Sequence, residues 1–560
     1  MADENEATAS SNMPAKDVVY TSYVVPVTTG RHKITITMSK KEFYDGTNEE
    51  VAKRIIQYLP YALDIHKRNE GEIDHLYRYY KGEQAILNKT KIVRPEINHI
   101  VVENHAYEIV EFLKSYVFGN PITYAQKGEK GIETSNEKIS ALNQEMEYIS
   151  KASDDKQIAE WQYICGTGYR FIDKGDDECP FSISVPDPRK TFVVYSNSIK
   201  EEVLFSGFIS EQIDNDSLIS EPANAFNQRR ILTIYTDNFY MQIQGNYLGA
   251  LDWEYVPIMQ TISYGDQFSI DSIVYPLVPK GNRIIEYPLN NARLGRVELV
   301  ETSLNAINQI KSNEVDDVDQ FVQSLLVFIN QEIDPEEYQK LIKLGAIEVN
   351  SNGTLPADVK LLSSHLSSKD TKTITDDLYN NVLSICGVPR LQDSPSGGDT
   401  GQARLIGEGW TMADERANQD ELSFKKSERK ALKLILDICD KAGNNEIKGL
   451  TPKDVEVKFT RNKQDNMLVK AQCLLNLKDA QVDPSVAFNT CGLFSDSNEV
   501  YLKSKGFYGD EFWKDKTERD TRANIDAPTD TTNLPKNSRV EVTEKTSNKQ
   551  VITDASNEAE

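Results

Sequence analysis

Apolar and polar residues alternate near the start of the chain, and the spacing then becomes helical. Residues 18–38 alternate between the two kinds, which predicts a two-stranded arm with its turn at residues 28–31. Further on, Ile158, Trp161 and Cys165 recur at the spacing of one helix face. On this pattern we expect helices at residues 48–67, 70–81, 98–118 and 134–165.

From Gly168 to about residue 271 the period shortens. Short runs of β-branched and aromatic residues alternate there with Gly, Asn, Asp and Pro, which indicates an antiparallel sheet region. The runs lie at residues 169–172, 191–195, 203–205, 231–235 and 239–243.

The second half begins with a long amphipathic helix. Val300, Leu304 and Ile307 keep helical spacing, and the pattern predicts a helix over residues 297–323, about 40 Å long at a rise of about 1.5 Å per residue. Acidic side chains occupy its other faces: Glu298, Glu301, Glu314, Asp316, Asp317 and Asp319. We interpret Asp316 and Asp317 as a solvated or tunnel-facing helix surface and not as a general acid and base.

A compact αβ unit is expected next. It consists of a strand at residues 325–329, a helix at 335–344, a strand at 346–349 and a turn at 350–353. After this unit, residues 367–370 resemble a capping box and open a helix that ends near Cys386, with Gly387 as its C-cap. Residues 389–401 are rich in Pro, Ser, Gly and Asp, which predicts a flexible loop, and residues 402–441 predict one long helix.

The last part of the chain returns to short elements. We expect a strand at 455–459 and helices at 464–479, 483–489 and 496–504. Residues 1–17 and those from about 515 are polar, and we expect them to be disordered.

Composition limits the function classes. The net charge of −24 makes the surface a poor general binder of phosphate backbones, so any contact with DNA must be locally basic or weak. The six cysteines form no C-x-x-C pair, which indicates reduced, intracellular thiols. The acidic N-terminus is not a secretory signal, and no apolar run approaches 18 residues, so we expect no membrane partner.

We find no pattern of residues that indicates catalysis or a cofactor. Residues 166–168, Gly-Thr-Gly, lack the third glycine of a dinucleotide fingerprint and indicate a helix C-cap and turn. There is no G-x-x-x-x-G-K-[ST], H-E-x-x-H or G-x-S-x-G, and His99 and His105 do not have the spacing of a metal-binding pair. We therefore predict a protein that is not an enzyme and that uses neither a metal nor a cofactor.

Three segments carry a resemblance to a known family. Residues 77–87 (YRYYKGEQAIL), 98–102 (NHIVV) and 115–124 (SYVFGNPITY) closely resemble the N-terminal region of portal proteins of tailed bacteriophages. The order helix, αβ unit, helix, glycine-rich loop and long helix resembles the same family. In that family the loop has Pro-Ser-Gly followed shortly by Ser-Gly-x-Ala. This chain has Thr-Gly-Gln-Ala in place of the second motif and one additional Gly-Asp pair, so the length of its loop departs from the family pattern.

The resemblance implies an α+β, mainly helical chain with the portal fold and its wing, stem, clip and crown regions. The implied regions are an N-terminal arm (1–44), a wing of helices and antiparallel sheet (45–296), a first stem helix (297–323), a clip (324–358), a second stem region (359–386, with its helix from 368), a tunnel loop (387–402), a long wing helix with a returning strand (403–460), a crown (461–506) and a disordered tail (507–560).

The resemblance also implies where DNA and partner proteins make contact. DNA-facing candidates in the tunnel loop are Arg390, Gln392, Asp393, Ser394, Ser396, Gly397, Gly398 and Gly401. On the second stem helix, Lys369 and Lys372 are candidates for brief contacts that do not depend on DNA sequence. In the clip, the candidates for binding partner proteins are Phe328, Asn330, Glu332, Glu348 and Asn350. Without the resemblance, an ordinary surface turn explains the loop glycines equally well.

As implied by the resemblance, the chain forms a homo-oligomeric ring, usually of twelve subunits, at one capsid vertex of the virion. Double-stranded DNA enters and leaves through it. The implied partners are the terminase large subunit, a head-completion adaptor, the major capsid protein and the scaffold, with assembly in the host cytoplasm. The alternative is another virion protein, such as a minor capsid adaptor without a channel, and an enzyme is a third interpretation.

Overall fold

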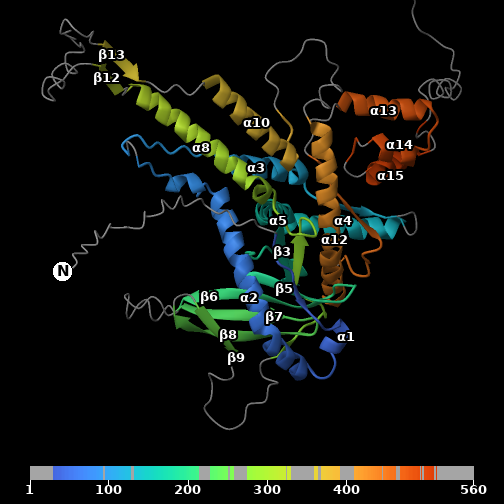
Figure 1. Cartoon of the computed structure of the whole chain (residues 1–560). Coiled ribbons are helices and arrows are strands. Elements are labelled where there is room, and N and C mark those ends of the chain that lie inside the picture. The colour runs from blue at the N-terminus through green and yellow to red at the C-terminus, as the bar shows by residue number, and fades with distance from the viewer. Residues whose placement is uncertain are drawn as a thin grey trace, which may run out of the picture. The chain divides into compact units, whose positions relative to one another are not determined.

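The computed structural model places most of the chain in helices and short strands (Figure 1). It describes residues 30–92, 95–127, 132–213, 228–249, 252–257, 274–322, 325–329, 358–362, 368–390, 409–443, 446–461, 467–491, 493–494, 497–509 and 513. The chain divides into two compact units, Met1–Asp465 and Asn466–Glu560.

The first unit opens with a short strand and two capped helices. β1 (Ile34–Ile36) precedes α1 (Lys40–Phe43) and α2 (Asn48–Tyr80), and Ser39 and Thr47 form capping boxes at the two helix starts. The two helices predicted at 48–67 and 70–81 are in fact one. The buried face continues through Ile73 and Leu76, so packing keeps the helix intact past its glycine. The predicted arm is tested only at β1, because residues 18–29 lie outside the described part.

Three more helices follow, and two of their predicted boundaries are wrong. The 3-10 turn η1 (Ala85–Asn88) precedes α3 (His105–Phe118), which begins seven residues later than predicted because Asn104 caps it. The helix predicted at 134–165 is two helices, α4 (Ile132–Tyr148) and α5 (Lys151–Cys165). Ser150 separates them with a left-handed backbone, φ 57°.

The predicted sheet region is confirmed, although it forms two sheets. The larger has the order β1-β5-β6-β7-β8-β10, with β9 also paired to β8, and every pair except the parallel β1–β5 is antiparallel. Its strands are β5 (Thr191–Ser196), β6 (Val203–Ile213), β7 (Gln228–Tyr235), β8 (Phe239–Gly249), β9 (Asp252–Pro257) and β10 (Tyr275–Pro276). α2 packs on it through Ile55 and Leu59, against residues such as Val194 and Leu232.

The second sheet lies against the long helix α12 (Trp410–Lys441). It has the order β11-β3-β4, formed by β3 (Thr167–Lys174), β4 (Phe181–Ser184) and β11 (Ile284–Pro288). The predicted returning strand is β14 (Val455–Lys458), which pairs antiparallel with β2 (Thr123–Gln126). Between these elements, Arg170, Asp155, Lys151 and Glu428 form a fully buried cluster of charges that we did not predict.

The remaining elements match the predicted order closely. α8 (Arg296–Val322) and α10 (Ser368–Cys386) flank the strand pair β12 (Leu325–Ile329) and β13 (Asp358–Leu362). β13 begins at Asp358, the last residue of the predicted clip, and otherwise occupies residues that we had assigned to the start of the second stem region. The second unit contains α13 (Met467–Asp479), α14 (Pro484–Cys491) and α15 (Ser497–Tyr508), which confirms three helices and extends the last into the predicted tail.

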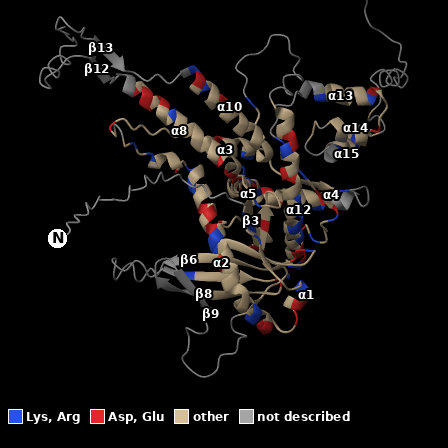
Figure 2. Cartoon of the chain, viewed as in Figure 1, with Lys and Arg blue, Asp and Glu red and all other residues tan. Residues whose placement is uncertain are grey.

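All six cysteines are free thiols, as predicted. Among the residues described, no helix combines the length and apolarity that a membrane crossing requires. Figure 2 shows basic and acidic residues interspersed along α2, α8 and α12.

Candidate functional site

A pair of helices, α8 and α10, carries the residues singled out by the sequence. The two helices lie side by side (Figure 1) and bury one apolar face in a shared core: Val297, Val300, Leu304 and Ile307 from α8, and Val382, Leu383 and Cys386 from α10. In α8, Val300, Leu304 and Ile307 are the positions whose spacing predicted the helix, whereas α10 was predicted from its capping box and from Gly387. β12 follows α8 after two residues, so the chain leaves along one helix, turns through a strand pair and returns along the other.

The strand pair between the helices has a defined register. Leu325 pairs with Leu362, and Phe328 pairs with Val359. Phe328 is thus confirmed as a strand residue. The other clip candidates, Asn330, Glu332, Glu348 and Asn350, lie outside the described residues, as do the predicted helix at 335–344 and strand at 346–349.

One face of α8 holds an extended segment of the chain. Asn308 accepts a hydrogen bond from Glu103 N (2.9 Å), and Ser312 Oγ accepts one from Val101 N (3.0 Å). One turn further on, Asp316 Oδ1 accepts from His99 N (2.6 Å). The i, i+4 spacing therefore places three polar side chains in a row, and each satisfies a backbone N–H of residues 99–103.

Asp316 is the most strongly held of these residues. Its Oδ2 atom lies 2.7 Å from Lys89 Nζ and 2.5 Å from Lys91 Nζ, and the side chain is 1% exposed. Although burial opposes ionisation, the hydrogen bonds from the two lysines and from His99 hold the pKa of Asp316 well below its usual range. The prediction that Asp316 lies on a solvated surface is wrong.

Two further acidic residues of α8 are also paired inside the fold. Glu298 Oε1 lies 2.8 Å from Arg31 Nη2, and Glu301 Oε1 lies 2.8 Å from His75 Nε2. Glu314, Asp317 and Asp319 are partly exposed. Of these three, Glu314 lies 3.5 Å from Lys311 and Asp319 lies 4.0 Å from His99.

The basic candidates of α10 differ in their surroundings. Lys369 and Lys372 are exposed near the start of the helix. Arg390 instead turns back onto α10, where its guanidinium donates to Asn380 O (3.3 Å) and Ser384 Oγ (2.6 Å). The helix ends as predicted at Gly387, which has a φ of 77°. The next residue closes the cap, because Val388 N donates a hydrogen bond to Leu383 O (2.9 Å).

The rest of the predicted tunnel loop, Gln392, Asp393, Ser394, Ser396, Gly397, Gly398 and Gly401, lies outside the described residues.

The positions considered for enzyme chemistry have structural roles. Gly166 has a φ of 82° and caps α5, and a Cβ there would lie 2.1 Å from Arg293 O, so the turn is closed by protein and not open to a phosphate. His105 lies between Glu103 and Glu108 at 3.2 and 2.8 Å. Within the described ranges, no group of three His, Cys, Asp or Glu side chains is placed to hold a metal ion.

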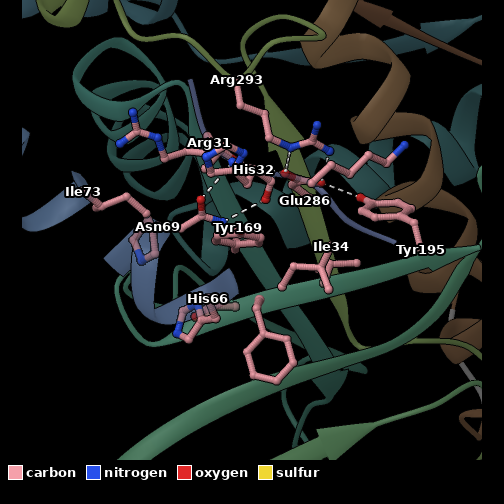
Figure 3. A pocket seen from close by; sticks show the side chains of 16 residues that line it. Arg31, His32, Ile34, His66, Asn69, Ile73, Tyr169, Tyr195, Glu286 and Arg293 are labelled. Atoms are coloured by element: carbon pink, nitrogen blue, oxygen red, sulfur yellow. Dashed lines mark hydrogen bonds and ion pairs between the residues drawn. The ribbon is translucent and has the colours of Figure 1, made fainter. Parts of the chain in front are cut away.

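A small cavity beside α2 shows how the N-terminal segment is anchored (Figure 3). Its volume of about 20 Å³ suits a single water rather than a substrate. Asn69 bonds both the N–H and the carbonyl of His32 at 2.8 Å, and Glu286 binds Arg293 and Tyr195. Burial lowers the pKa of His66 to about 4, so this histidine is neutral near pH 7 and serves packing.

The structure has a helix pair joined by a strand pair and followed by a long helix. This is the order of elements expected from the resemblance to portal proteins of tailed bacteriophages. A sequence model of the phage portal protein family of the SPP1 Gp6-like type matches residues 60–484, which is more than half of the chain. The chain therefore belongs to this family, and is a virion protein of the capsid that serves genome packaging. No curated protein matches it.

Proposed function

We propose that this chain forms a closed ring, usually of twelve subunits, through which double-stranded DNA is packaged and ejected. The observation that carries the proposal is the α8–β12/β13–α10 unit in a chain of the portal family. In one copy this helix pair leaves apolar side chains in water: Leu299 (41% exposed), Val315 (40%), Val318 (64%), Ile374 (54%) and Ile385 (43%). A neighbouring copy can cover them, and repeated head-to-tail contacts close into a ring.

We assign the regions as the resemblance implies: α8 and α10 as the stem, β12 and β13 as part of the clip, residues 387–402 as the tunnel loop, and α13 to α15 as crown helices. The exposed Lys369 and Lys372 make brief contacts with passing phosphates, whereas the chain's net charge of −24 keeps DNA from adhering. Arg390 reaches DNA only if it leaves its bonds to α10.

The proposed partners are the terminase large subunit during packaging and a head-completion adaptor afterwards, both on the clip. The major capsid protein and the scaffold contact the outside of the ring, which assembles in the host cytoplasm. The chain itself performs no catalysis in this scheme, since motion of DNA is driven by the terminase. We propose that these partners pair with strand edges of the clip through backbone hydrogen bonds.

Shortening residues 393–399 tests the tunnel assignment. We expect rings to assemble as in the parent, because a Gly-, Ser- and Pro-rich segment contributes little to a core, while the yield of DNA-filled heads falls to a small fraction. The measurement compares ring formation and nuclease-protected DNA per head. A control replaces the same seven residues by a Gly-Ser sequence of equal length. Loss of rings, or normal filling of heads by the shortened protein, contradicts the assignment.

A further inference from the structure

A basic crevice lies on the first unit, away from the helix pair. Its volume is about 480 Å³, within the range of about 300–1,000 Å³ typical of ligand sites. Its lining includes the apolar residues Val203, Ile284 and Leu434. Five lysines from α1, the β5–β6 turn, the turn before β11, and α12 line it: Lys40, Lys200, Lys280, Lys430 and Lys433.

Most of the carboxylates at the crevice already have a cation. Asp237 lies 2.6 Å from Lys40, and Glu201 lies 2.6 Å from Lys33. The third, Glu286, is buried against Arg293 at 2.6 Å.

Four lysines remain without such a partner. Among the described residues, no carboxylate lies within 4.0 Å of the amines of Lys200, Lys280, Lys430 and Lys433. Two exposed carboxylates, Glu202 and Asp437, also line the crevice. Four unpaired cations against two carboxylates leave the crevice positive in a chain whose net charge is −24.

The protein positions these lysines on well-held elements. Gly281 N donates to Asp237 O (2.7 Å), and Asn282 Nδ2 donates to Tyr235 O (3.2 Å), which fixes the turn that carries Lys280. A Cβ at Gly281 would lie 3.0 Å from Leu434, so this turn and α12 are in close contact.

Lys430 is an exposed residue of the crevice. Desolvation is the main cause that lowers its pKa; the positive charges of Lys426 and Lys33 lower it further, and the carboxylate of Glu286 acts in the opposite direction. A bound anion would relieve this repulsion.

We infer that this crevice binds the phosphate groups of a polyanion. Lysine amines act as point charges on phosphate oxygens, and several of them can share the oxygens of one phosphate. Such contacts do not depend on base sequence. Two ligands carry the phosphate groups that this site would bind, the backbone of double-stranded DNA and a small polyphosphate. The site uses no residue of the helix pair or of residues 387–402, so it stands or falls independently of the proposed channel.

The test is equilibrium binding of two probes to the full chain, a fluorescent 30-base-pair duplex and tripolyphosphate. The variant is Lys430→Gln with Lys433→Gln. The matched control is Lys53→Gln with Lys441→Gln, which removes the same charge from exposed lysines that do not line the crevice. We expect the variant to bind at least one probe about tenfold more weakly than the control. For the duplex, the slope of log K against log salt concentration should be smaller in magnitude by about 2 in the variant.

The outcomes separate the sources. If tripolyphosphate displaces the duplex from the parent chain, a small polyphosphate suffices for the site; if it does not and the variant loses duplex affinity, the DNA backbone is the ligand. Equal binding of both probes by the variant and the control overturns the inference. The inference is also overturned if neither phosphate probe binds the crevice, but poly-glutamate binds tightly and the variant weakens that binding. The crevice would then recognise a carboxylate-rich segment of a protein. Thermal melts of variant and control verify folding.

Discussion

Replacement of Glu428 by glutamine is expected to lower the free energy of unfolding by about 3–5 kcal/mol, because it breaks a buried charge network. Glu428 is 0% exposed and lies 2.7 Å from Arg170 and 3.2 Å from Lys151. Tyr124 and Tyr287 also donate hydroxyl hydrogen bonds to it, at 2.5 and 2.8 Å. Among the described residues, the variant leaves the two buried cations with Asp155 as the one carboxylate within 4.0 Å.

Urea unfolding followed by circular dichroism measures this loss, with Glu415→Gln as the control because Glu415 is an exposed residue of the same helix. A change of less than about 1 kcal/mol in the Glu428 variant, the scale of an exposed pair, would show that the cluster does not hold the fold together.

The same carboxylate predicts a pH dependence. Arg170 and Lys151, acting against burial, lower the pKa of Glu428 to about 2 from its ordinary value of 4.5. A depressed pKa contributes stability that is complete above pH 4.5 and is lost as the pH falls toward 2. We therefore expect the stability difference between parent and Glu428→Gln to shrink across this window, and a difference independent of pH would contradict the assignment.

Replacement of Asp316 by alanine should release residues 89–103 from α8 at a cost of about 2–3 kcal/mol, the scale of hydrogen bonds to a charged group. The variant leaves His99 N, Lys89 and Lys91 without their shared acceptor. We expect a smaller loss than for Glu428, because the side chains of Lys91 and His99 are 27% and 44% exposed and water can replace part of the interaction.

Hydrogen exchange measured by mass spectrometry reports this release directly. Amides of residues 89–103 should exchange faster in the Asp316 variant, while those of α12 stay unchanged. Asp317→Ala is the matched control, since the Asp317 carboxylate is partly exposed and makes no hydrogen bond to the segment among the described residues. Equal exchange in the two variants would show that the segment is held by other contacts.

Helix periodicity predicted α8 well because its apolar positions face a core within the same chain, and the capping signals at residues 367–370 and Gly387 predicted α10. The predicted helix at 297–323 is Arg296–Val322, and the second ends at Cys386 as expected from Gly387. Local signals failed where distant contacts decide the conformation. Residues 98–104 have helical character in sequence, yet their N–H groups bond to Ser312 and Asn308, more than two hundred residues away.

The site was harder to predict for the same reason. Acidic residues along a helix suggest a solvated surface, and only the fold shows that Glu298, Glu301 and Asp316 meet Arg31, His75 and two lysines. The polar spacing of Asn308, Ser312 and Asp316 was a usable signal, because it places a second, non-apolar stripe along the helix. The buried partnership of Arg170 with Glu428 joins residues 258 positions apart and had no local signal.

The central claim is that copies of this chain close into a ring around a channel, and electron microscopy of the purified full-length protein, with native mass spectrometry of the same sample, tests it most directly. The account predicts closed rings with a central hole and a mass near twelve copies, because the exposed apolar residues of α8 and α10 require a neighbour. Only monomers at micromolar concentration and moderate salt would contradict it.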